Sequence, residues 1–128
     1  LGLAEGTDYV AFYDSTMARF WFMNDGARNR ITEALASLDC GRALSDDDLR
    51  SEGILFEDRR FGELVVLMNP GVLVVPSHMG ANAPRGMHGF TPEHPDSYAV
   101  LMSSEELTPA PVHIKDSFTA MKTLLDRG

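Results

Sequence analysis

Two continuous apolar segments on either side of a turn sequence constrain the fold of this chain more than any other feature. The segments Glu63–Met68 and Val72–Pro76 flank Asn69-Pro70-Gly71, and an Asn-Pro-Gly sequence is typical of tight turns. The pattern therefore predicts a hairpin or a tight strand pair. Neither segment alternates apolar with polar residues, so we expect both faces of these strands to be covered.

The charge balance limits the partners of the chain. Its 11 Lys and Arg residues are scattered, and its 19 Asp and Glu residues give a formal net charge of -8. Nucleic acids and anionic membrane surfaces both require clustered basic residues, so we expect neither as a partner. No apolar segment approaches the roughly 18–20 residues that span a bilayer. The single cysteine, Cys40, excludes an internal disulfide and favours a reducing compartment, so we expect a cytoplasmic location.

The chain begins without an initiator methionine, a basic segment or a signal-peptide core. We interpret it as a piece of a longer polypeptide, and we expect the remainder of that polypeptide to be its main partner. We divide the sequence into residues 1–53, which read as a cap or insert, and residues 54–128. The strand and helix patterns predict an α+β fold, with a mixed or antiparallel sheet of about four to six strands and about three helices.

Residues 1–53 predict strand followed by helix. Aromatic and β-branched residues in Tyr9–Met23 favour one strand, or two short strands that meet near Asp14-Ser15. A helix over about residues 26–38 follows, with Asn24 or Asp25 as its N-cap and Gly41 as its C-terminal stop.

A shorter helix is expected over residues 45–52. Ser45 offers a capping hydroxyl, and the three aspartates that follow it suit the positive end of a helix dipole. These aspartates lack the alternating oxygen ligands and the closing glutamate of a calcium loop, so we expect no calcium site.

Three further elements are expected in residues 54–128. Ile54–Phe56 predicts a short strand, and Tyr98–Met102 predicts a buried one. A last amphipathic helix over residues 116–126 places four apolar side chains on its buried side: Phe118, Met121, Leu124 and Leu125.

A glycine-rich loop presents a histidine near the end of the chain. His88 lies between Gly86 and Gly89, and the prolines Pro92 and Pro95 stiffen the exit from the loop. A ring nitrogen on such a loop suits a metal ligand, although one histidine alone is no metal site.

The order of these segments resembles the C-terminal part of the alkaline phosphatase superfamily, particularly its type I phosphodiesterase/nucleotide pyrophosphatase branch. The matching segments are Gly62–Pro76, then Gly86-Met87-His88-Gly89-Phe90, then Pro95–Met102, and Val112–Asp116 at the start of the final helix. The resemblance covers about residues 54–126, and residues 9–53 loosely resemble the preceding cap. Phe90 stands where tyrosine is more usual in the family.

This resemblance implies a metal-dependent phosphoesterase. In the family, two zinc ions share Asp and His ligands around a Thr or Ser nucleophile, and His88 falls on one zinc ligand. The chain has no Asp-His-Gly ligand motif, no second aspartate ligand motif and no nucleophile at a strand-to-helix turn. We therefore expect it to supply one ligand to a parent enzyme that acts on a small phosphoester or nucleotide, and to be inactive alone.

Other candidate residues have simpler interpretations. A local metal site would combine His88 with His78 and His94 and with Glu93 or Asp96, but the proline-broken spacing disfavours it. His113 is expected to be structural. The hydroxyls of Ser15 and Thr16 lack an activating base nearby in the sequence, so we expect no nucleophile there.

Two interpretations stay open for the arginines and for the chain as a whole. Arg19, Arg59 and Arg60 either reach substrate phosphate or form ordinary ion pairs, and the second is favoured in an acidic protein. The alternative to the enzyme is a non-catalytic α+β domain that binds a protein partner. Apolar strands left uncovered would also allow a homodimer.

Overall fold

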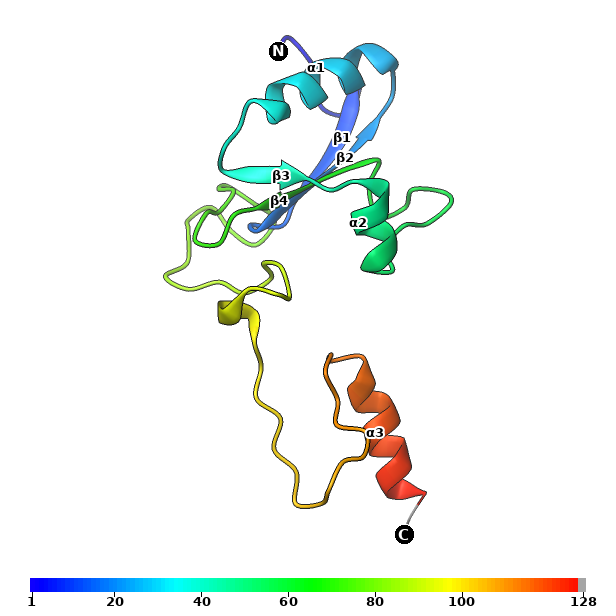
Figure 1. The fold of residues 1–128 in the computed structure, drawn as a ribbon. Helices are drawn as coiled ribbons and strands as arrows, with labels where there is room; N and C mark the ends of the chain where they lie inside the picture. Colours follow the sequence, from blue (N-terminus) through cyan, green and yellow to red (C-terminus); the bar gives the residue numbers. More distant parts are fainter. Residues whose placement is uncertain (127–128) are drawn as a thin grey trace. The chain divides into compact units, whose positions relative to one another are not determined.

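The computed structural model describes residues 1–126, which form two compact units (Figure 1). The first unit spans Leu1–Tyr98, and the second begins at Ala99. Within the described residues, the chain has one four-stranded antiparallel sheet and three α-helices, so the predicted α+β class is confirmed. None of the helices in this part of the chain is long and apolar enough to cross a membrane.

The sheet of the first unit has the strand order β1-β2-β4-β3. Its strands are β1 (Tyr9–Tyr13), β2 (Met17–Phe22), β4 (Leu64–Met68) and β3 (Gly41–Ala43). The predicted strand over Tyr9–Met23 is thus two strands joined at residues 14–16, with Ala11 opposite Phe20. The predicted strand at Glu63–Met68 is also confirmed, and it occupies an interior position between β2 and β3.

Helix α1 (Asp25–Ala36) lies on one face of this sheet (Figure 1). It begins where predicted, because the Asn24 Oδ1 accepts a hydrogen bond of 2.8 Å from the Ala27 N–H. Ile31 from the helix joins a buried core that the strands complete with Ala11, Ala18, Phe20, Val66 and Met68. Burial of these apolar side chains is the main stabilising term of the first unit.

The predicted helix stop at Gly41 is wrong. The helix ends at Ala36, and Gly41 is the first residue of β3, opposite Met68. A Cβ at Gly41 would lie 2.7 Å from the Leu67 carbonyl oxygen, so this strand approaches β4 too closely for any larger residue.

Helix α2 (Asp46–Ser51) begins at the predicted cap. Ser45 and Asp48 form a reciprocal capping box, in which the Asp48 N–H donates to the Ser45 hydroxyl and the Ser45 N–H donates to the Asp48 carboxylate. After this helix the predicted strand at Ile54–Phe56 is wrong. The N–H groups of Ile54 and Leu55 both donate to the Leu49 carbonyl, so the segment folds back on α2 and pairs with no strand.

The predicted strand pair is only half formed. A turn is present where predicted, because the Val72 N–H donates to the Asn69 carbonyl at 2.9 Å. Val72–Pro76 then leaves β4 and forms no strand, because the Val74 N–H is used in a 2.7 Å hydrogen bond to the Ser15 carbonyl. The expectation that both faces are covered is confirmed for β4, in which Val65 is 0% exposed and its neighbour Val66 is 3% exposed.

The second unit contains the predicted last helix, α3 (Asp116–Leu125). The Asp116 carboxylate accepts hydrogen bonds from the N–H groups of His113 and Val112, which lower the pKa of Asp116. The predicted buried side of the helix is wrong, because Phe118 is 70% exposed and Leu125 is 80% exposed.

The predicted buried strand at Tyr98–Met102 is also wrong. This segment has no regular secondary structure, and its apolar side chains are exposed. An apolar segment forms a strand only where a partner strand is available. In the described chain, no strand pairs with Tyr98–Met102.

By packing, the chain divides between Tyr98 and Ala99. The division at residues 53 and 54 suggested by the sequence stays a prediction about the origin of the two parts. In the folded chain, β4 from the later part lies between two strands from the earlier part.

Candidate functional site

His88 lies in an irregular loop of the first unit, and its side chain is exposed. Among the hydrogen bonds and ion pairs formed by residues 1–126, none involves the His88 imidazole. Both ring nitrogens therefore remain available for a ligand. The sequence predicted a loop position for His88, and its metal-binding role stays a prediction.

Gly89 fixes the exit from this loop. Its φ of +97° lies in the region that favours glycine. A Cβ at this position would lie 3.0 Å from the Thr16 Oγ1, so the loop backbone lies directly against the β1–β2 turn. The contact joins two segments that are 73 residues apart in the sequence, from position 16 to position 89.

The β1–β2 turn is itself buried and held from several directions. Ser15 is 1% exposed and has a φ of 56°, and Thr16 is 5% exposed. The Ser15 carbonyl accepts from the Val74 N–H, and the Thr16 carbonyl accepts from the Met68 N–H at 2.9 Å. A rigid, hydrogen-bonded turn therefore supports the loop that carries His88.

Two of the other histidines have structural partners. The His78 ring stacks on Phe12 with 4.1 Å between centroids, and its Nδ1 lies 3.2 Å from both backbone polar atoms of Tyr13. The His94 Nδ1 accepts a 3.3 Å hydrogen bond from the Asp96 N–H, which caps the short 3-10 helix η1 (Pro95–Ser97).

The alternative local metal site is not assembled. Within residues 1–126, no three side chains among His, Cys, Asp and Glu are close enough to hold a metal ion together. In the described part of the chain, His88 is therefore not a member of a three-residue ligand group. His113 is exposed just before α3, where its N–H donates to Asp116.

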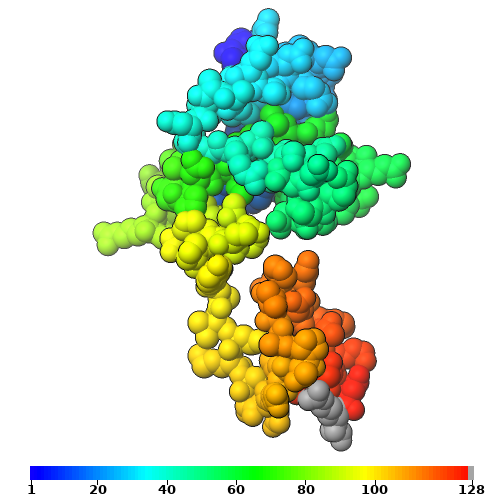
Figure 2. Space-filling view, viewed as in Figure 1, coloured from blue at the N-terminus to red at the C-terminus, as the bar shows by residue number. Residues whose placement is uncertain are grey.

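A pocket of about 220 Å³ lies beside the His88 loop. Gly89–Glu93 forms one wall, and in the space-filling view this part of the chain, in yellow, packs against the cyan and green segments (Figure 2). Apolar side chains from the sheet and from the segment after α2 line the interior: Met17, Leu44, Ile54 and Leu67. Charged groups also line the pocket, including the Arg42–Asp48 ion pair with a distance of 3.0 Å.

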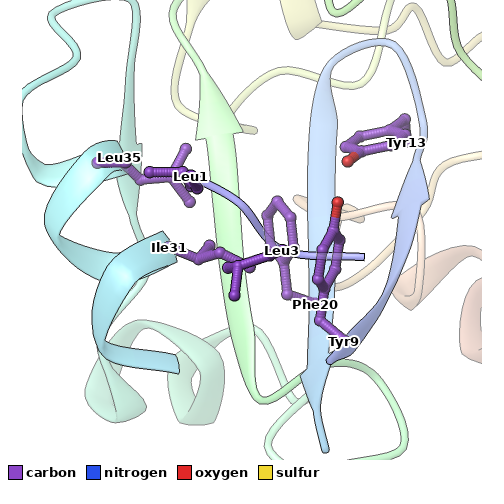
Figure 3. A pocket seen from close by; sticks show the side chains of 8 residues that line it. Leu1, Leu3, Tyr9, Tyr13, Phe20, Ile31 and Leu35 are labelled. Atoms are coloured by element: carbon purple, nitrogen blue, oxygen red, sulfur yellow. The ribbon is translucent and has the colours of Figure 1, made fainter. Parts of the chain in front are cut away.

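A second pocket, of about 310 Å³, lies between α1 and the sheet (Figure 3). Its walls are apolar except for the hydroxyls of Tyr9 and Tyr13. Burial, with smaller contributions from Tyr9 and Glu5, raises the pKa of Tyr13. Tyr13 therefore stays neutral at physiological pH, and the side chains that line this pocket carry no charge.

The three candidate phosphate-binding arginines form ion pairs. The Arg19 guanidinium lies 4.7 Å from the Phe12 ring and 4.9 Å from the Phe61 ring, with Asp14 at 3.9 Å. Arg59 forms two 2.7 Å hydrogen bonds to Asp46, which lower the pKa of that carboxyl. Arg60 pairs with Asp58 at 2.9 Å. The ion-pair interpretation is confirmed for all three.

Sequence reasoning did not identify the contact between Thr16 and Gly89. Glycines flanking His88 indicated an unusual backbone, but the residue facing Gly89 comes from a distant turn. Only the presence of a polar Ser-Thr pair between two apolar strands pointed to a special environment at that turn.

Comparison with known proteins gives no relative. The chain matches no protein-family model, no curated protein and no solved structure.

Proposed function

We propose that this chain is part of a metal-dependent phosphoesterase of the phosphodiesterase or nucleotide pyrophosphatase type, to which His88 contributes one zinc ligand. One observation carries the proposal. The His88 imidazole is exposed and without a partner in the described residues, on a loop that Gly89 seats against a buried turn. The motif resemblance around Gly86–Phe90 supplies the expected metal and reaction.

The chemistry of the loop supports a ligand role. Zinc binds neutral imidazole through a ring nitrogen, which must be free to reach the ion. His78 and His94 each engage Nδ1 in a hydrogen bond, whereas neither ring nitrogen of His88 has a partner among the described residues. The proposal assigns only His88 to the metal, because residues 1–126 bring no three candidate ligands together.

The remaining ligands and the Thr or Ser nucleophile would come from the remainder of the parent polypeptide, which is the main proposed partner. When bound, two zinc ions would lower the pKa of the nucleophile and neutralise charge on the phosphoryl oxygens. This chain would present the His88 ring to one ion from its loop. We infer a small phosphoester or nucleotide as the substrate, a cytoplasmic location, and no activity for the chain alone.

A chelator experiment tests this function. The complete polypeptide that carries this chain is assayed on a chromogenic phosphodiester before chelation, after chelation and after addition of zinc. We expect turnover to disappear on chelation and to return with zinc. Turnover that chelation leaves unchanged would exclude a metal-dependent mechanism.

The exposed apolar side chains of the second unit favour a second candidate, a non-catalytic domain that binds a protein partner. Val112 and Ile114 precede α3, and Phe118, Met121 and Leu125 lie on it, all exposed. An apolar surface of this kind is typical of an interaction site. A complete polypeptide that contains no metal and hydrolyses no phosphoester would favour this candidate over the enzyme.

A further inference from the structure

The two glycines that flank His88 have different surroundings. A Cβ at Gly86 would have no atom within 4 Å, whereas a Cβ at Gly89 would lie 3.0 Å from the Thr16 Oγ1. Gly89 also has a φ of +97°. The loop is therefore held on the side of Gly89 and open on the side of Gly86.

Thr16 is a fixed point for this contact. Its residue is 5% exposed, its N–H donates to the Asp14 carbonyl at 2.6 Å, and its carbonyl accepts from the Met68 N–H. The N–H is thus bonded within the turn, and the carbonyl is bonded to β4. The Thr16 hydroxyl takes part in none of the hydrogen bonds formed by residues 1–126, although its Oγ1 is the atom that faces Gly89.

We propose that Thr16 is a positioning residue for His88, because the close approach of its Oγ1 to Gly89 limits where the backbone beside His88 can lie. This inference rests on the proposed metal role of His88 and adds a second residue, far away in the sequence, to that site. A displacement of Gly89 by a few tenths of an ångström carries His88 with it, since the two residues share a peptide bond. Metal sites lose affinity when the groups that orient a ligand are removed.

A double-mutant cycle on the 128-residue chain tests the contact without any reference to metal. The variants are Gly89→Ala, Thr16→Ala and the two combined, with Gly86→Ala as the matched control. Amide hydrogen exchange of residues 87–90 is measured, and exchange in β4 reports on global stability. We expect Gly89→Ala to speed local exchange strongly in the wild-type background and less in the Thr16→Ala background. Gly86→Ala should leave local exchange near the wild-type rate.

The complete, metal-loaded polypeptide tests the functional part. We expect Gly89→Ala and Thr16→Ala to reduce zinc content and to lower turnover by about 10²-fold, with melting temperatures close to wild type. The loss of turnover in the double variant should be smaller than the product of the two single losses. Thr16→Ser should restore much of the zinc content and turnover that Thr16→Ala loses, because it keeps the Oγ1 atom.

The two measurements separate the failure of this inference from the failure of the proposed function. If Gly89→Ala and Thr16→Ala change amide exchange independently while His88→Ala loses zinc, the positioning role of Thr16 is contradicted and the metal role of His88 is not. If the two substitutions are coupled in amide exchange but His88→Ala keeps its zinc, the metal role of His88 is contradicted. The positioning role then fails with it.

Discussion

The Ser15 hydroxyl lies 2.8 Å from the Ser77 hydroxyl and joins the β1–β2 turn to a loop 62 residues later in the chain. Ser15 is 1% exposed, whereas Ser77 is half-buried and also accepts from the Met79 N–H at 3.1 Å. Ser15 therefore depends on Ser77 for its side-chain hydrogen bond. The turn that this bond secures is the one on which the His88 loop rests.

This asymmetry predicts different costs for the two serine-to-alanine variants. Ser77→Ala leaves the buried Ser15 hydroxyl unpaired, so we expect it to lower the free energy of unfolding by about 1–3 kcal/mol. Ser15→Ala removes the buried hydroxyl together with its bond, and we expect a loss of about 1 kcal/mol. Urea unfolding of both variants measures the difference. A larger loss for Ser15→Ala would contradict this account of the turn.

The N-terminus of α2 predicts a pH dependence. Hydrogen bonds from the Ser45 hydroxyl and N–H, and then from Arg42, lower the pKa of Asp48 from 3.8 to about 2. A carboxyl whose pKa is depressed on folding stabilises the folded state above the unfolded pKa. That contribution is lost as the pH falls from 3.8 towards about 2.

Carboxyl titration by NMR measures this effect. We expect a midpoint near 2 for Asp48, and a higher midpoint in Ser45→Ala because the hydrogen bond that lowers the Asp48 pKa most is gone. The control Asp47→Asn changes a charge in the same turn without removing the capping bonds, so the Asp48 midpoint should stay near 2. An unchanged midpoint in Ser45→Ala would exclude the capping box as its cause.

The sequence predicted the helix starts and the first two strands because their signals are local. The side-chain cap at Asn24, the hydroxyl cap at Ser45 and the turn between two aromatic strands each depend on neighbouring residues. Such features form from the same few residues in almost any context. They were therefore predictable without knowledge of the tertiary structure.

The three strand predictions that were wrong share one physical reason. All three segments are apolar: Ile54–Phe56, Val72–Pro76 and Tyr98–Met102. An apolar sequence indicates burial or contact, but it does not show that the backbone pairs with another strand. In the first two segments, backbone N–H groups bond to Leu49 and Ser15 carbonyls in place of a neighbouring strand. The short strand β3 was missed because its three residues, Gly-Arg-Ala, carry no periodic pattern.

The candidate site was predictable only in part. His88 was identified by a local motif, and the structure places it in an exposed loop. The proximity of Thr16 to Gly89 could not be predicted without the tertiary fold, because 73 residues separate the two in the sequence.

Self-association is a third prediction, and the structure changes its expected location. Strand β4 is covered on both faces, so it offers no surface for a homodimer, but α3 exposes Phe118 and Met121. We expect the chain to associate as its concentration rises, through this apolar surface. Light scattering on wild type, Phe118→Lys and the control Lys122→Ala tests this expectation. Association that Phe118→Lys does not weaken would exclude the α3 surface.

Zinc binding to the chain alone is a fourth prediction. His88 supplies one of the roughly four ligands of a stable zinc site, so we expect weak binding or none at a defined site. Calorimetric titration of the 128-residue chain measures this directly. A stoichiometric site of sub-micromolar affinity that disappears in His88→Ala would show that other residues of this chain complete the site.

The most direct test of the proposed zinc ligand compares two histidine variants in the complete polypeptide. His88→Ala removes the ligand, whereas His94→Ala removes only the ring that caps η1. Phosphodiester turnover, zinc content and melting temperature are measured for both. We predict that His88→Ala loses zinc and about 10²-fold or more in turnover at a near wild-type melting temperature, and that His94→Ala loses far less turnover. Near wild-type turnover and full zinc content in His88→Ala would contradict the assignment.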